Sequence, residues 1–115
     1  MRSKVIIKFK AAGFHCYPDA PKEVYFLAAR HRHMFEFICE FLVDDLDREK
    51  EIFIETKRVI NQIIEKFGSP CEFGAMSCEM IAAFILENNI DQGMSACEVW
   101  EEETGGARVE SNPER

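Results

Sequence analysis

His31 and His33, which are separated by one residue, are the side chains most suited to bind a metal ion. Residues i and i+2 of an extended strand project from one face, so both imidazoles can bind the same metal ion. The third histidine, His15, follows another alternating stretch. If the two stretches pair as antiparallel strands, the three imidazoles meet.

Three neutral imidazoles that leave one position open are the usual protein ligands of a catalytic zinc ion. The sequence therefore predicts a zinc site at His15, His31 and His33. The alternative is that the His-x-His pair is two ordinary histidines, one exposed and one packed, because two imidazoles are only half of a site.

Apolar and polar residues alternate in the stretches that must position these histidines, and their periods predict the secondary structure. Strands are expected over residues 4–12 and 29–43, and the chain is expected to re-enter the sheet near residues 23–27. Two further strands are expected from about residue 93 to 110, with a turn at Gly105 and Gly106. Helices are expected over residues 55–67 and from an N-cap at Ser77 to Asn88 and Asn89. We interpret the charged residues 44–51 as a solvated turn rather than a calcium loop, because no glycine marks the bend.

Size and composition bound the class of protein. The 115 residues predict one domain, residues 1–110, with a flexible tail over 111–115. A net charge of −7 argues against nucleic acid as a partner, and no apolar run is long enough for a membrane helix. We expect no signal peptide, a cytoplasmic location and free thiols for the five cysteines, while ten phenylalanines suit an oligomer with a large buried interface.

Five segments, in chain order, resemble the motifs of one enzyme family. They are residues 9–15 (FKAAGFH), 30–35 (RHRHMF), 53–57 (FIETK), 76–79 (MSCE) and 99–101 (VWE). Over residues 5 to about 109, the chain resembles the tunnelling-fold family of 6-pyruvoyltetrahydropterin synthase and 6-carboxytetrahydropterin synthase.

The resemblance implies an α+β fold, β-β-α-α-β-β, with a four-stranded antiparallel sheet and two helices on one face. It implies that subunits assemble into a barrel, as trimers or hexamers, and that zinc is the cofactor. It also implies that Glu101 binds a pterin or purine-like ring, since a carboxylate offers two acceptors to adjacent N–H and amino groups.

The chain departs from the family pattern in its proton-transfer groups. Leu27 stands where the family has a catalytic cysteine, and leucine can be neither acid nor base. Residues 65–68 replace the family's further histidine. Cys16, beside His15, is the candidate catalytic residue, because a nearby metal ion lowers a thiol's pKa; Asp19 and Glu23 are further candidates.

Two functions stay open, with a third as the plainest case. The protein is a zinc-dependent pterin synthase or lyase with altered proton-transfer groups, or it binds a pterin, purine or nucleotide without turning it over. The third case is a structural oligomer whose pocket is empty.

Overall fold

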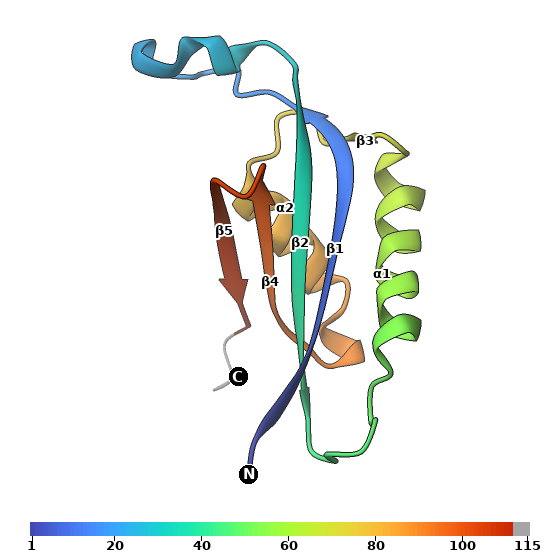
Figure 1. Cartoon of the computed structure of the whole chain (residues 1–115). Helices are drawn as coiled ribbons and strands as arrows, with labels where there is room; N and C mark the ends of the chain where they lie inside the picture. The colour runs from blue at the N-terminus through green and yellow to red at the C-terminus, as the bar shows by residue number, and fades with distance from the viewer. Residues whose placement is uncertain (112–115) are drawn as a thin grey trace.

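Five strands form one twisted sheet in the computed structural model, which describes residues 1–111 (Figure 1). The strands are β1 (Ser3–His15), β2 (His31–Val43), β3 (Cys71–Glu72), β4 (Met94–Glu101) and β5 (Gly105–Glu110). Their spatial order is β3-β1-β2-β4-β5. Only the short β1–β3 pair is parallel.

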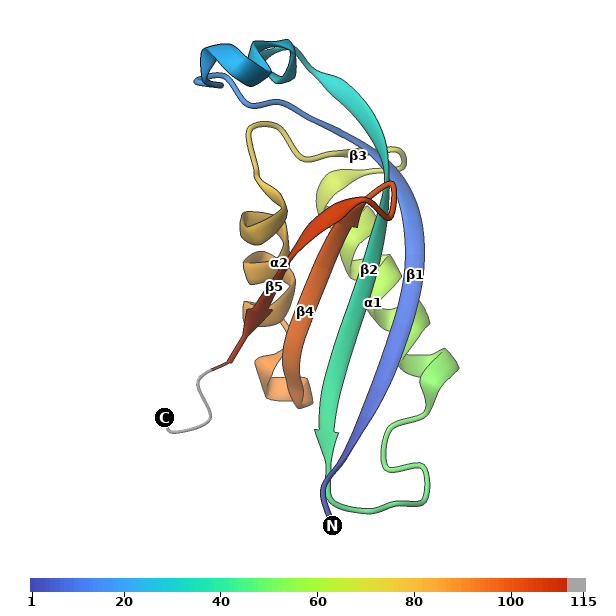
Figure 2. The same cartoon turned by 60° about the vertical axis from the view of Figure 1, so that its left-hand side comes forward.

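Both α-helices cover the same face of the sheet, which makes the fold a two-layer α+β structure (Figure 2). Helix α1 (Ile52–Phe67) packs on the β1 side, and α2 (Cys78–Glu87) packs against β4 and β5. Glu51 caps α1 by accepting hydrogen bonds from the N–H groups of Phe53 and Ile54. Ser77 caps α2, as the sequence predicts. Two short 3-10 segments, Lys22–Ala28 and Ile90–Gln92, complete the described chain.

The core lies between the sheet and the helices. The predicted apolar face of β2 is confirmed: Phe35, Phe37, Cys39 and Phe41 are all fully buried. Val59 and Ile63 of α1 and Ile81 and Ile85 of α2 close this core from the other side. The two histidines of β2 share the face of these phenylalanines, so the core continues directly into the candidate site.

The predicted four-stranded sheet is corrected to five strands by β3. After α1 the chain returns alongside the end of β1, where Cys71 and Glu72 pair with Gly13 and Phe14. Cys71 and Phe73 are buried there, so the added strand closes the end of the core. A strand of two residues is too short to show any period in the sequence.

Residues 23–27 do not re-enter the sheet, so this part of the prediction is wrong. They belong to the 3-10 segment Lys22–Ala28, which contains no buried residue and extends beyond the sheet at the end of β1 (Figure 1). Pro21 precedes the segment, and the aromatic side chains of Tyr25 and Phe26 are exposed. An apolar composition alone does not make a strand when no neighbouring strand is there to pair with it.

The turn between β4 and β5 also differs from the prediction. It is made by Glu102, Glu103 and Thr104, whereas Gly105 and Gly106 already pair with Glu101 and Trp100. Glu102 and Glu103 have positive φ angles. Gly106 is required for a different reason, because a Cβ there would lie 2.5 Å from the carbonyl oxygen of Val99.

The outer face of the sheet carries an ion-pair network centred on Arg108 of β5. Its guanidinium group donates hydrogen bonds to Glu40, Glu98 and Glu110. The Arg108 hydrogen bonds, helped by Lys4, lower the pKa of Glu40 to about 2. The network therefore connects β1, β2, β4 and β5 through charged side chains.

Arg108→Gln is expected to lower the free energy of unfolding by about 1 kcal/mol at neutral pH, because these pairs are only partly shielded from solvent. A carboxyl group with a depressed pKa stabilises the fold above its ordinary pKa of 4.5, and this contribution disappears as the pH falls to about 2. The difference between wild type and variant should therefore shrink across that range. Urea unfolding at several pH values measures it, with exposed Lys22→Gln as the charge-matched control; an equal difference at every pH would contradict the expectation.

Over residues 1–111, no helix combines the length and the apolar character needed to cross a membrane. Four residues of the predicted tail, 112–115, lie outside the described residues. Ser111 is held to β4, because its N–H donates a hydrogen bond to the carbonyl oxygen of Ser95.

Candidate metal centre

The structure brings the three histidines together at one end of the sheet. His15 is the last residue of β1 and His31 is the first residue of β2, and the two are paired in the antiparallel register. His33 lies two residues further along the same face. One ring nitrogen from each histidine lies within 4.8 Å of the corresponding nitrogens of the other two. The two strands pair in antiparallel fashion, and the three imidazoles meet as predicted for that pairing.

Two of the imidazoles are oriented by a hydrogen-bond acceptor at Nδ1, and the third has a carboxylate near its Nδ1 atom. His15 Nδ1 lies 2.9 Å from the carbonyl oxygen of Met76, and His31 Nδ1 lies 2.9 Å from that of Ala29. His33 Nδ1 lies 3.5 Å from a carboxylate oxygen of Glu102. An acceptor at Nδ1 fixes the proton there and leaves the lone pair on Nε2. Histidines that bind metals are held in this way by carbonyl or carboxylate groups.

Because main-chain carbonyl groups occupy Nδ1 of His15 and His31, Nε2 is the nitrogen that remains to bind an ion. The Nε2 atoms of His31 and His33 are buried and have no hydrogen-bond partner within the described residues. A buried polar atom without a partner is costly, so its presence needs a reason. A metal ion would supply that reason, because it would accept the lone pairs of His31 and His33, and that of His15 once it replaced the Nε2 proton that His15 donates to Glu101. The residues therefore fit a metal ion.

Packing behind the rings limits their movement. The ring of Phe35 lies edge-on to His15 and His33, with centroids 5.2 and 5.7 Å away. Gly13, which pairs with His33 across the strands, leaves room for this arrangement. A Cβ at Gly13 would lie 2.9 Å from the Phe73 ring and 3.1 Å from Phe35. The aromatic core and the close packing at Gly13 of β1 thus hold the histidine rings in place.

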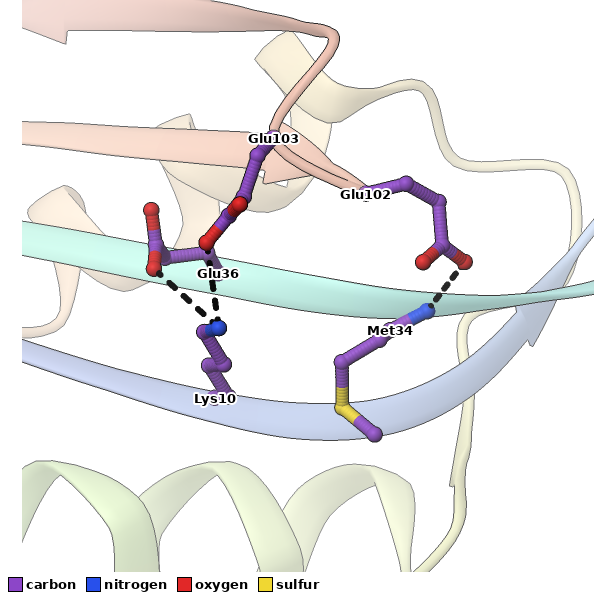
Figure 3. Close-up of a pocket in the computed structure, with 5 residues that line it drawn as sticks. All are labelled: Lys10, Met34, Glu36, Glu102 and Glu103. Carbon is purple, nitrogen blue, oxygen red and sulfur yellow. Dashed lines mark hydrogen bonds and ion pairs between the residues drawn. The ribbon is translucent and has the colours of Figure 1, made fainter.

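Two neighbouring glutamates border the site at the end of β4. Glu101 Oε2 lies 3.0 Å from His15 Nε2, and Glu101 Oε1 lies 3.4 Å from His33 Nε2 without hydrogen-bond geometry. Glu102 turns to the outer face, where it accepts a 2.7 Å hydrogen bond from the N–H of Met34 (Figure 3). On that face, Lys10 lies between the carboxylates of Glu36 and Glu103 (Figure 3).

The contact between Glu101 and His15 changes the pKa of both groups. The hydrogen bond with His15 lowers the pKa of Glu101 to about 2, and a hydrogen bond from Cys78 adds to this effect. Burial lowers the pKa of His15, but the hydrogen bonds to Glu101 and Met76 outweigh burial and raise it. Glu101 is therefore a carboxylate at neutral pH, as a metal ligand or a hydrogen-bond acceptor must be.

Comparison with known proteins gives support from fold only. No protein-family model and no curated protein sequence matches the chain. An uncharacterized protein from Wolinella succinogenes has a similar structure, with a TM-score of 0.71, 13% identity, and 97% of this chain and 99% of that chain covered. Caenorhabditis elegans 6-pyruvoyl tetrahydropterin synthase matches with a TM-score of 0.69, 8% identity and 97% of both chains covered. The chain shares the fold of 6-pyruvoyl tetrahydropterin synthase.

Within this pterin-synthase fold, the predicted catalytic residue Cys16 follows His15 at the end of β1. It is half-buried, and its N–H donates a hydrogen bond to the carbonyl oxygen of Gly74. Within residues 1–111, no hydrogen bond or ion pair joins its thiol to the histidines, so its catalytic role stays a prediction. Leu27 belongs to the 3-10 segment, where its carbonyl oxygen accepts a hydrogen bond from the N–H of Tyr17.

Sequence reasoning missed Cys78, the thiol that does contact the candidate metal centre. Cys78 is the first residue of α2, and its Sγ atom donates a 3.3 Å hydrogen bond to Glu101 Oε2. Burial, reinforced by the nearby carboxylate of Glu101, raises the pKa of this thiol to about 12. Cys78 therefore acts as a donor to Glu101 at neutral pH. In the sequence Cys78 stands within the motif-like segment 76–79 and directly after an N-cap, and the N-cap indicates a helix rather than a site.

Proposed function

We propose that this chain is a divergent 6-pyruvoyl- or 6-carboxytetrahydropterin synthase-like protein that binds one metal ion on His15, His31 and His33. The observation that carries the proposal is the convergence of one ring nitrogen from each of the three histidines, together with two buried Nε2 atoms that have no partner in residues 1–111 and two rings held at Nδ1. Zinc is the expected ion, because imidazole ligands suit it and its filled d shell imposes no preferred geometry on the site. Bound there, the ion would act as a Lewis acid toward an oxygen atom of a ligand.

The proposed ligand is a pterin or purine-like molecule. The fold likeness to a pterin synthase supports this class. The acidic groups beside the imidazoles, Glu101 and Glu102, suit a planar base whose N–H and amino groups need acceptors. The formal charge of −7 makes a polyanionic nucleic acid a poor alternative.

We also propose that the protein is a homo-oligomer, a trimer or a hexamer whose subunits close a barrel. Within residues 1–111, no strand pairs with the outer edge of β5. At the other side of the sheet, β3 covers only Gly13 and Phe14 of β1. Open edges of this kind pair readily with a second chain, so a barrel formed by several subunits would remove them.

Catalysis and binding without turnover remain separate candidates. Binding without turnover is favoured by the state of Cys78, since a thiol with a pKa of about 12 that already donates to Glu101 is not available as a base. Cys16 is the proposed catalytic residue if the protein is an enzyme. Incubation with dihydroneopterin triphosphate separates the two, because only an enzyme forms product, whereas both bind the compound.

The metal proposal is tested by elemental analysis of the untagged protein, side by side with His33→Ala. We expect about one zinc ion per chain in the wild type. We expect the zinc affinity of the variant to fall by more than the roughly 10–100-fold that follows from removing a residue that hydrogen-bonds to a metal ligand. Arg32→Ala is the matched control, because Arg32 lies between the two histidines of β2 but is exposed and projects from the opposite face.

His31→Ala provides a second test if His33→Ala does not fold. Metal retained by both variants, or absent from the wild type after reconstitution with zinc, would refute the proposed centre. In the second case the protein would be the binding or structural oligomer without a metal.

A further inference from the structure

The hydrogen bonds to the carboxylate of Glu101 fall on one of its two oxygen atoms. Oε2 lies 3.0 Å from Nε2 of His15 and accepts a 3.3 Å hydrogen bond from the Cys78 thiol. Oε1 lies 3.4 Å from Nε2 of His33, which makes no hydrogen bond within the described residues. Each carboxylate oxygen offers about two acceptor positions. Side chains of the protein therefore occupy both positions of Oε2, while Oε1 keeps its own.

The contact of His15 with Glu101 excludes binding of an ion at the same nitrogen atom. His15 Nδ1 lies 2.9 Å from the carbonyl oxygen of Met76, so Nε2 is the atom that either donates to Glu101 or binds an ion. A ring nitrogen that donates a proton has no lone pair for a metal ion, and metal binding releases such protons. Binding of an ion at Nε2 therefore sends this proton to solvent, and Oε2 of Glu101 loses one of its two donors.

The number of free positions on Glu101 decides how well it can hold a planar ring. A ring that presents an N–H and an amino group side by side needs both oxygen atoms of a carboxylate. While His15 donates to Oε2, Glu101 can offer only Oε1 to such a ring. Once His15 no longer donates, Glu101 can offer both oxygens, because Cys78 uses one position of Oε2 and leaves the other.

This change of partner requires little movement of either side chain. Glu101 is the last residue of β4 and pairs with Phe35 of β2, and its main-chain carbonyl accepts hydrogen bonds from the N–H and hydroxyl groups of Thr104. The His15 ring is held by Met76 and is only 8% exposed. Groups that are already held in place lose little conformational entropy when they bind a ligand.

We infer that His15 makes ring binding at Glu101 conditional on metal binding, because its Nε2 atom blocks Oε2 of Glu101 until that nitrogen binds an ion. The inference rests on the metal and the ligand of the proposed function, and it adds how the two are coupled. Such coupling is reciprocal. A ring that takes the position on Oε2 also removes the acceptor of the His15 proton, which favours the ion.

The test measures the binding of unsubstituted pterin, which is fluorescent, to the full chain stripped of metal with a chelator. His15→Ala and His31→Ala each remove one of the three imidazoles, but only His15→Ala removes the donor to Glu101. We expect metal-free His15→Ala to bind pterin at least about 10-fold more tightly than metal-free His31→Ala or wild type, because a hydrogen bond to a charged group becomes available. Equal pterin affinity in the two variants would overturn the inference.

The wild-type protein provides a second measurement that does not depend on the folding of His15→Ala. Zn²⁺ should raise the affinity for pterin, pterin should raise the affinity for Zn²⁺ by the same factor, and His31→Ala should lose both effects. A wild type that binds Zn²⁺ but has the same pterin affinity with and without it would overturn the inference alone. A wild type that binds no Zn²⁺, or no pterin in either state, would overturn that part of the proposed function together with the inference, so the failures are distinguishable.

Discussion

Replacing Phe35 by alanine is expected to lower the free energy of unfolding by about 3–5 kcal/mol, the usual cost of truncating a buried aromatic residue. The Phe35 side chain is fully buried, and its ring centroid lies 5.1 Å from that of Phe73. The same ring lies against His15 and His33. The cavity would therefore open directly behind the candidate metal centre, where a compensating shift would also move the imidazoles.

Urea unfolding followed by circular dichroism measures this loss. Phe53→Ala is the matched control, because the Phe53 side chain is 81% exposed and its truncation should change the free energy of unfolding by less than about 0.5 kcal/mol. A loss below 1 kcal/mol in Phe35→Ala would show that the core collapses into the space without cost, contrary to the expectation.

The second large effect is expected at Asn89, which joins the two α-helices. Its side chain is fully buried. Its amide nitrogen donates hydrogen bonds to Gln62 Oε1 of α1 and to the Ile85 carbonyl oxygen of α2, and its amide oxygen accepts one from Arg58 of α1. Asn89→Ala leaves these groups without their partner, and each such buried group costs about 1–3 kcal/mol. We expect a total loss of about 2–4 kcal/mol.

Asn88→Ala is the control for this change. Asn88 is the exposed neighbour, and its side chain donates one hydrogen bond to the carbonyl oxygen of Phe84. Thermal and urea unfolding of the two variants should differ clearly, with the larger loss in Asn89→Ala. Equal losses would mean that water replaces the Asn89 side chain and that the helices do not depend on it.

The elements that could be predicted are those in which apolar and polar residues alternate with a regular period. The alternation along residues 29–43 predicted which side chains of β2 are buried, since a period of two assigns each residue to one face. Antiparallel pairing of the two stretches was a condition of the prediction, and the structure has that pairing and with it the meeting of the three histidines. Ser77 marked the start of α2 through its capping side chain.

Other features gave no readable signal because they depend on contacts between distant residues. The acceptors at His15 and His31 are the main-chain carbonyl groups of Met76 and Ala29, and any residue type supplies a carbonyl. Asn89 looked like a simple helix end, yet its importance comes from Arg58 and Gln62 on the other helix. Contacts of this kind are set by tertiary packing and not by local sequence pattern.

The way in which the three imidazoles are held has a consequence for the whole chain. Their Nδ1 partners, Ala29, Met76 and Glu102, belong to three loops that are far apart in the sequence. An ion bound to the rings would close the loop between His15 and His33, and by fixing the rings it would also restrain the entry to α2 and the final hairpin, which contact them at Nδ1. Constraints that close long loops remove the most entropy from the unfolded chain. Metal loading should therefore slow amide hydrogen exchange in all three loops together, while the opposite end of the sheet, near Val43, exchanges as before.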